Sequence, residues 1–336
     1  MGTLLLRSAP GTVGGMTMEF FGSVAGRLAA VGRELLVQAL AVYATLLKVM
    51  LPALLVVKAL DMAGATGWLA VLLSPSMQLV GLPDAMGLVW ATAMLTNLYT
   101  AIAVYAGFAA QEPLTVAQAT VLGTMMLVSH SLPVEGAVAR ASGVGWRATL
   151  LVRIGGALVL GALLHRVYAS SAALQQPARL LGQAPPPDPA LTAWALAQLQ
   201  MLVWILVVIV ALMTLLRLLR AVGIERLIHA MLAPLLNLIG IRREAANATV
   251  IGITLGLSFG GGLLIREARS GVLTPRDMLL VMSLLGLCHS LIEDTLLMLL
   301  LGAHLSGILW ARLAFALVVV ALIAHWPRRR AAAGAP

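Results

Sequence analysis

Residues 190–216 read ALTAWALAQLQMLVWILVVIVALMTLL, a stretch of 27 residues without a charged side chain. About 20 consecutive apolar residues are enough for a helix to cross a bilayer. The stretch therefore predicts a transmembrane helix, and the rest of the chain has the same character. Of its 336 residues 61% are hydrophobic and 10% are charged, with a mean hydropathy of +0.99. Soluble domains are about 45–50% apolar and about 25% charged, so the composition predicts a polytopic membrane protein.

The rest of the composition excludes several functional classes. Cys288 is the only cysteine, which excludes an intrachain disulfide and a multi-cysteine metal or iron–sulfur site. The net charge of +9 comes from arginines that separate apolar segments, so it indicates membrane orientation and no nucleic-acid partner. The chain has no P-loop and no zinc-protease or serine-hydrolase motif, so we expect no enzyme activity and no cofactor.

The apolar segments predict an all-α polytopic membrane protein of about ten transmembrane or re-entrant helices. They span residues 35–57, 62–82, 86–108, 114–134, 146–168, 191–216, 224–240, 246–265, 278–300 and 307–326. Segments 62–82 and 224–240 contain a proline and several polar residues, so each is either a crossing or a re-entrant hairpin. We divide the chain into an N-terminal cytoplasmic or interfacial segment (1–34), a first repeat (35–170), a Pro-rich linker (171–190), a second repeat (191–326) and a basic tail (327–336).

The two halves match when the chain is shifted by 159 residues, which predicts an internal repeat. The polar matches weigh most, because polar residues are rare in a membrane chain: His130-Ser131-Leu132 falls on His289-Ser290-Leu291, Glu135 on Asp294 and Arg153 on Arg312. Five segments in each half make the second half inverted relative to the first. With both termini in the cytoplasm, most Lys and Arg residues lie inside, including Arg328–Arg330. We therefore expect a multi-pass protein of a bacterial inner membrane.

The strongest candidate site is the repeated pair of motifs at residues 129–135 and 288–294. Ionisable groups inside a membrane mark functional sites by default, and inverted repeats place substrate where the halves meet. We expect His130, Glu135, His289 and Asp294 to face a central cavity. His289 and Glu293 are four residues apart and should share a helical face. Pro133 should break its helix after His130 and free backbone carbonyls. The alternative is that these groups are hydrogen bonds that close the bundle.

Other polar positions extend this candidate site. Arg153 and Arg312 serve as counter-ions to the acids, contact an anionic substrate group, or extend to the membrane interface. The Gly-rich stretch 256–262, which includes Ser258, and its counterpart 96–100 are broken-helix candidates. For the glycines the alternative, close packing of helices through small residues, is slightly favoured. We expect Asn97 and Tyr99 to line the cavity. The substrate-binding set is His130, Ser131, Glu135, His289, Ser290, Asp294, Asn97, Tyr99 and Ser258, with Arg153, Arg312 and Glu293 in ion pairing or coupling.

The HSLPVE and HSLIED motifs, the SFGGG segment and the two-half layout resemble the nucleoside recognition or Gate domain family. Gate domains also occur in concentrative nucleoside transporters, in the membrane core of ferrous iron transporter B and in spore maturation proteins. The resemblance covers most of residues 40–325 and implies a permease-like core of two inverted Gate repeats. The chain lacks the GTPase domain of ferrous iron transporter B and a cysteine-rich pore. It is shorter than a concentrative nucleoside transporter, so sodium-coupled nucleoside transport does not carry over.

Three functional hypotheses follow. The first is a secondary transporter or permease for a small polar solute, nucleoside-like by the resemblance. The second is a divalent-metal permease with His130, Glu135, His289, Glu293 and Asp294 as ligands, because imidazole and carboxylate suit iron, zinc and manganese. The third is a non-transporting subunit that assembles with another membrane protein through small-residue faces. The lipid bilayer is the expected partner in all three, and homo-oligomer formation stays open.

Overall fold

The computed structural model describes residues 13–109, 111–180, 191–238, 241, 245, 249–250, 252–253, 257–271 and 273–325. Over these residues the chain is all-helical, and only an isolated bridge between Thr115 and Pro177 has strand-like pairing. The predicted class, an all-α protein, is confirmed. Within the described part of the chain, five stretches are long and apolar enough to cross a membrane: Ala29–Met62, Val116–Ala141, Trp146–Ser171, Leu191–Ala221 and Ser306–His325. The other predicted segments form shorter helices where they are described.

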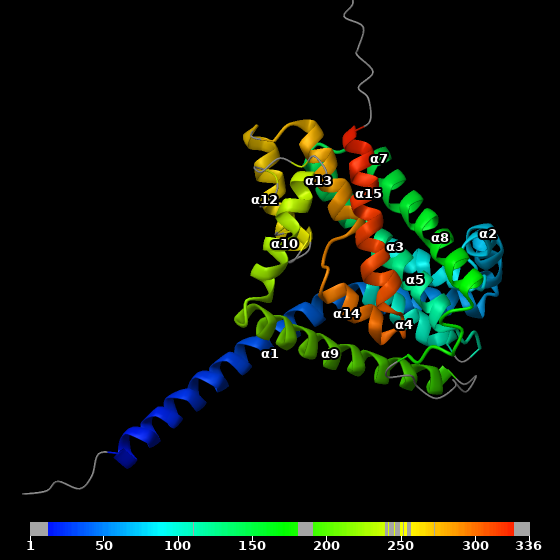
Figure 1. The fold of residues 1–336 in the computed structure, drawn as a ribbon. Helices are drawn as coiled ribbons and strands as arrows, with labels where there is room; N and C mark the ends of the chain where they lie inside the picture. The colour runs from blue at the N-terminus through cyan, green and yellow to red at the C-terminus, as the bar shows by residue number, and fades with distance from the viewer. Residues whose placement is uncertain are drawn as a thin grey trace, which may run out of the picture.

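The helices of the first half follow the expected segments, but several segments are broken into two (Figure 1). In chain order they are α1 (Val13–Met62), α2 (Ala65–Leu79), α3 (Met86–Leu95), α4 (Leu98–Phe108), α5 (Val116–Ser129), α6 (Leu132–Ala141), α7 (Trp146–Leu150), the π-helical turn η1 (Leu151–Gly155) and α8 (Gly156–Ser171). The α7–η1–α8 unit is one continuous helical rod that packs against α5.

The second half is also helical where it is described. Its elements are α9 (Leu191–Ala221), α10 (Ile224–Leu238), α12 (Leu257–Ser270), α13 (Pro275–Leu287), α14 (Glu293–Leu300), the π-helical turn η2 (Ser306–Ala311) and α15 (Arg312–His325). Bounds that are 159 residues apart coincide at several places. The 15-residue helices α2 and α10 correspond at both ends, and α1 and α9 end at corresponding residues.

The structure bears on two of the expected domain limits. Helix α1 is continuous from Val13 to Met62, so no boundary falls between residues 34 and 35. The first part of the linker, residues 172–180, lies against the start of α5, where Val116 N donates to Gln176 O and Ala178 N donates to Leu114 O. Residues 181–190 and the tail 327–336 lie outside the described residues.

Helices α2 and α10 are too short to cross a bilayer as straight helices. At 1.5 Å per residue, 15 residues reach about 22 Å, against a hydrocarbon core of about 30 Å. Each contains a proline, Pro75 and Pro234 respectively. The two alternatives for these segments, a shortened crossing or one arm of a re-entrant hairpin, therefore both remain predictions.

Three described breaks interrupt the apolar segments. Asn97 starts α4 as its N-cap, and its Oδ1 accepts from the backbone nitrogen of Thr100. The chain also leaves the α-helix between α5 and α6 and between α13 and α14, and each of these breaks contains a serine in the left-handed conformation. These serines are Ser131, with φ 51°, and Ser290, with φ 47°. Left-handed backbone costs a non-glycine residue about 1–2 kcal/mol, so the surrounding packing must impose it.

The Gly-rich stretch does not unwind where it is described. Residues 257–262 lie in α12, which is continuous to Ser270. The alternative of a broken helix at these glycines is therefore wrong for this part of the stretch, and residue 256 lies outside the described residues. A helix satisfies its own backbone groups, which favours it over irregular chain inside a membrane even through several glycines.

Helices α1 and α9 lie side by side and run in opposite directions. Glu34 pairs with Arg217, with 3.1 Å between Oε2 and Nη2, and further along α1 the ammonium of Lys58 lies over the ring of Trp194. Between them Tyr43 donates from its hydroxyl to Leu202 O at 3.0 Å. Tyr43 and Leu202 are 159 residues apart, which is the shift at which the two halves match in sequence.

The α7–α8 rod and α15 also run in opposite directions. In Figure 1 the α7–α8 rod starts at the top of the view and descends to the right, whereas α15 rises from near α14 to the top. The core between them is formed by α5 and α13, whose residues are almost all buried. The two helix breaks that follow α5 and α13 therefore lie inside the bundle, where they position the candidate site.

Candidate functional site

The two histidines meet at the centre of the bundle. His130 comes directly after the last residue of α5, and Cys288 separates His289 from the end of α13. Their Nε2 atoms are 3.2 Å apart and their ring centroids 4.9 Å apart. Both side chains are buried, and His130 lies near the middle of the candidate span Val116–Ala141. The expected meeting of the two motifs is present in the structure.

Both acids of the motifs face this histidine pair. Glu135 Oε1 lies 3.4 Å from His130 Nε2 and 3.2 Å from His289 Nε2. Asp294 Oδ2 lies 3.9 Å and 4.0 Å from the same two nitrogens. The acids come from the first turns of α6 and α14, just beyond the left-handed serines. Each break therefore carries the chain past its histidine and returns an acid toward it.

Backbone carbonyls fix the orientation of both imidazoles. His130 Nδ1 lies 3.1 Å from Met126 O, and His289 Nδ1 lies 2.7 Å from Leu285 O. A carbonyl oxygen can only accept, so Nδ1 carries the proton in both rings. A neutral imidazole with a protonated Nδ1 has its lone pair on Nε2. Both lone pairs thus point into the space that the two rings share with the acids.

Two buried arginines donate to backbone carbonyls at the two helix breaks. Arg153 in η1 and Arg312 at the start of α15 are each 1% exposed, so neither extends to the membrane interface. Arg153 Nε donates to Val128 O at 2.8 Å and Arg312 Nε donates to Leu287 O at 2.9 Å. These carbonyls lie in the last turns of α5 and α13, where the helix breaks leave them without a helical partner. Pro133 lies in the first break, whereas the second break contains no proline.

The arginines differ in their relation to the acids. Arg153 Nη1 donates to Glu135 Oε2 at 2.5 Å, the counter-ion role expected from the sequence. Arg312 Nη2 donates instead to His289 O at 2.8 Å. The other nitrogen of Arg312, Nη1, and Asp294 Oδ2 are buried without a hydrogen-bond partner. We call the six side chains of His130, His289, Glu135, Asp294, Arg153 and Arg312 the central cluster.

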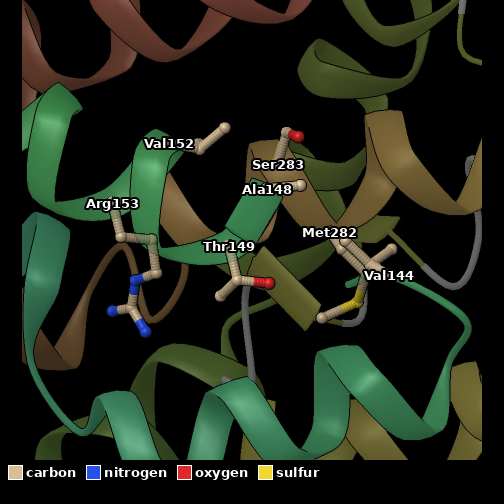
Figure 2. Close-up of a pocket in the computed structure, with 7 residues that line it drawn as sticks. All are labelled: Val144, Ala148, Thr149, Val152, Arg153, Met282 and Ser283. Carbon is tan, nitrogen blue, oxygen red and sulfur yellow. The ribbon is translucent and has the colours of Figure 1, made fainter. Parts of the chain in front are cut away.

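Of two cavities among the described residues, one lies beside the central cluster and the other lies away from it. One of about 10 Å³ lies beside Arg153, Thr149 and Ser283 (Figure 2), a volume that fits about one water molecule. The other, of about 250 Å³, lies between α5 and α8 and is lined by residues that include Gln118, His165 and Tyr168. Of the central cluster, only Arg153 lines either of these cavities.

Other predicted site residues lie away from the histidines. The carbonyl oxygen of Asn97 is used in the cap of α4, and the hydroxyl of Tyr99 donates to Glu293 Oε1 at 3.4 Å. Glu293 does not share a face with His289, because α13 ends at Leu287 and α14 begins only at Glu293. The expected His289–Glu293 face is therefore wrong, and Asp294 faces the histidines in its place.

The remaining predicted residues are the three serines. Ser131 donates from its hydroxyl to Thr96 O at 2.8 Å, which ties the break after α5 to the break before α4. Ser290 is part-buried and sets the turn after His289. Ser258 lies in α12, and its side chain is outside the described residues. The serines of the motifs thus shape the backbone around the histidines.

One supporting residue was not foreseen from the sequence. Trp90 in α3 is buried and donates from Nε1 to Ser129 Oγ at 2.8 Å, next to His130. At the position that corresponds to Ser129 the second half has Cys288, which is buried. A tryptophan inside an apolar segment gives no sequence signal for this contact, because the same residue type also packs against lipid.

These features define the chain as an all-helical membrane protein with ionisable side chains buried at its centre. It is 29% identical over 288 residues to the uncharacterized membrane protein YvoD of Bacillus subtilis (strain 168), across 84% of this chain and 90% of that protein. No family model and no solved structure matches the chain. The similarity to a membrane protein agrees with the apolar helices.

Proposed function

We propose that this protein is a membrane permease whose central site lies where two inverted repeats meet, and that it moves a small polar solute or ion. The observation that carries the proposal is the contact of corresponding residues. His130 meets His289, and Tyr43 meets Leu202, each pair 159 residues apart. Such self-pairing is what a two-fold axis between two similar halves produces.

The antiparallel course of α1 and α9 supports inversion of the halves. A two-fold axis that relates two antiparallel, membrane-crossing helices lies in the plane of the membrane. Inverted-topology repeats of this kind are common in secondary transporters, which bind substrate near the midplane beside broken helices. The histidines and acids of the central cluster lie at two such breaks. Ionisable groups at this depth are costly, so their presence indicates a function.

The close approach of the side chains favours a small substrate. The Nε2 atoms of the two histidines are 3.2 Å apart, and each of them lies 3.2–4.0 Å from a carboxylate oxygen of both acids. A nucleoside would have to separate them, whereas an ion fits among them without large movement. The resemblance to Gate domains therefore supports the permease class, and the geometry favours a substrate smaller than a nucleoside.

A thiol-accessibility experiment tests the permease proposal without knowledge of the substrate. Ser290→Cys in a Cys288→Ser background places one thiol beside His289. In a permease we expect a membrane-impermeant thiol reagent to label it in both right-side-out and inside-out vesicles. Leu122→Cys in the same background is the control, because Leu122 is 0% exposed in the same bundle.

The three outcomes separate the hypotheses. Labelling from both faces supports alternating access to the centre. Labelling from neither face contradicts a permease and supports hydrogen bonds that only close the bundle. Labelling from one face also contradicts a permease, and supports a one-sided binding protein or subunit. For a transported solute we further expect His130→Ala/His289→Ala to abolish uptake into proteoliposomes while the protein stays folded.

A further inference from the structure

We propose that the central cluster binds a divalent first-row transition-metal ion through His130 Nε2, His289 Nε2, Glu135 Oε1 and Asp294 Oδ2. The inference rests on the permease proposal and names the substrate class of that site. Glu293 is not one of the proposed ligands, because its carboxylate contacts Tyr99 instead of facing the histidines.

The first support is the direction of the lone pairs. Both Nδ1 atoms face backbone carbonyls and must donate, so both Nε2 atoms present lone pairs to each other at 3.2 Å. Glu135 Oε1 adds a third electron-rich atom at 3.2 and 3.4 Å from them. Three acceptors at such distances repel one another unless a positive charge lies among them. The backbone thus forces an arrangement that a cation stabilises.

The second support is the spacing of the donor atoms. A tetrahedral metal with bonds of about 2.0–2.1 Å holds its ligand atoms about 3.3 Å apart. The three distances among the two Nε2 atoms and Glu135 Oε1 are 3.2, 3.2 and 3.4 Å. Asp294 Oδ2 is farther out, at 3.9 and 4.0 Å, and it is buried without a hydrogen-bond partner. A small shift of this carboxylate completes a four-ligand site.

The third support lies in the surrounding contacts. Metal-binding histidines commonly donate their other ring nitrogen to a carbonyl or carboxylate, and ligating carboxylates are themselves hydrogen-bonded. Both histidines donate Nδ1 to carbonyls here, and Glu135 keeps Oε1 toward the rings because Arg153 binds Oε2. The outer contacts of a metal site are therefore built into the two helix breaks.

The charge of the central cluster suits a transported ion better than a structural one. Arg153 and Arg312 already balance Glu135 and Asp294, so a divalent ion adds uncompensated charge. Binding is weaker than in a structural zinc site for this reason. Permeation requires such a balance, since an ion must bind well enough to enter and weakly enough to leave. Imidazole with carboxylate favours iron, cobalt, zinc or manganese over magnesium and calcium.

The experiment uses Co²⁺ as the probe on the full-length protein purified in detergent. Equilibrium dialysis with metal analysis gives the stoichiometry, and the visible spectrum of Co²⁺ reports tetrahedral coordination by nitrogen and oxygen. We expect one Co²⁺ per chain, displaced by Zn²⁺ and not by Mg²⁺. His130→Ala, His289→Ala and Asp294→Asn should each lose or weaken binding. Asp294→Asn keeps the side-chain shape, so it covers the case in which a histidine variant does not fold.

His304→Ala is the matched control. His304 lies between α14 and η2, where its Nδ1 contacts Ser306 Oγ at 2.9 Å, away from the central cluster. Binding retained in His304→Ala and lost in His130→Ala supports the site. No Co²⁺ bound by the wild type, or binding unchanged in His130→Ala/His289→Ala, overturns it, and the first result leaves a shared proton as the positive charge among the acceptors. Either result leaves the permease proposal standing if Ser290→Cys is labelled from both faces.

Discussion

At the scale of single residues, the buried charges place the strictest demands on the molecule. Arg153 is 1% exposed, and its ion pair with Glu135 lies in the core of a membrane protein. A buried ion pair adds little net stability, but the loss of one partner strands the other charge. The stability of the bundle therefore depends on Arg153 more than on the arginines at its surface.

We expect Arg153→Met to lower the free energy of unfolding by about 3–5 kcal/mol, because Glu135 is left as an uncompensated buried carboxylate. Adding Glu135→Gln should recover part of this loss. Arg217→Met is the control, because the Arg217–Glu34 pair is exposed and should contribute less than about 1 kcal/mol. Unfolding in mixed micelles, followed by circular dichroism, measures all three. Equal losses in Arg153→Met and Arg217→Met would contradict the assigned role.

At the scale of helices, close packing depends on glycines at particular contacts. A Cβ on Gly307 in η2 would lie 2.4 Å from Thr120 Cγ2, so η2 approaches α5 closely only because residue 307 is glycine. The glycine of the other π-helical turn, Gly155 in η1, has only Leu151 Cδ1 at 3.9 Å from such a Cβ. The two positions differ in packing although both lie in π-helical turns.

Alanine substitution should therefore have different effects on stability at the two glycines. Gly307→Ala should destabilise the protein by about 1–3 kcal/mol through overpacking against Thr120. Gly155→Ala should be neutral or stabilise by up to about 1 kcal/mol, because alanine favours helix over glycine. Thermal unfolding of the two variants in detergent tests this pair. A stable Gly307→Ala would mean that α5 and η2 can separate at little cost.

How far the sequence predicts these helices depends on whether a break leaves a chemical signal. Pro133 indicated the break after α5, and the repeated His and acid positions indicated that the motifs face each other. No proline lies in the break after α13, where Ser290 takes the left-handed conformation. That break follows from tertiary contacts, so the sequence wrongly predicted a continuous His289–Glu293 face. The sequence also could not predict which atoms each arginine binds. Its carbonyl partners are available as acceptors only because the helices end there.

At the scale of the whole molecule, the correspondence of elements 159 residues apart bears on membrane topology. Helices α1 and α9 end at Met62 and Ala221, both exposed, and the two helices run antiparallel. If both cross the bilayer, these two ends lie on opposite sides of it. This is the topology expected of an odd number of crossings in each half.

Cysteine labelling in intact and inverted vesicles tests this arrangement. In a Cys288→Ser background we expect Met62→Cys to react with a membrane-impermeant maleimide from the outer face and Ala221→Cys from the cytoplasmic face. Cys288→Ser alone is the unlabelled control. Labelling of both positions from the same face would mean that the antiparallel helices α1 and α9 do not both cross the bilayer, and would remove the inverted-repeat support for the permease proposal.

The unequal pairing of the two arginines has a mechanical consequence. The halves place the same types of group in the same positions, yet only Arg153 holds its acid, while Arg312 binds a carbonyl. An exchanged arrangement, with Arg312 on Asp294 and Arg153 released, uses the same kinds of bond. We expect the two arrangements to be two energy minima whose depths differ only through the differences between the halves. In that case the pair of arginines would act as a toggle, and small changes around either arginine would set which arrangement is favoured.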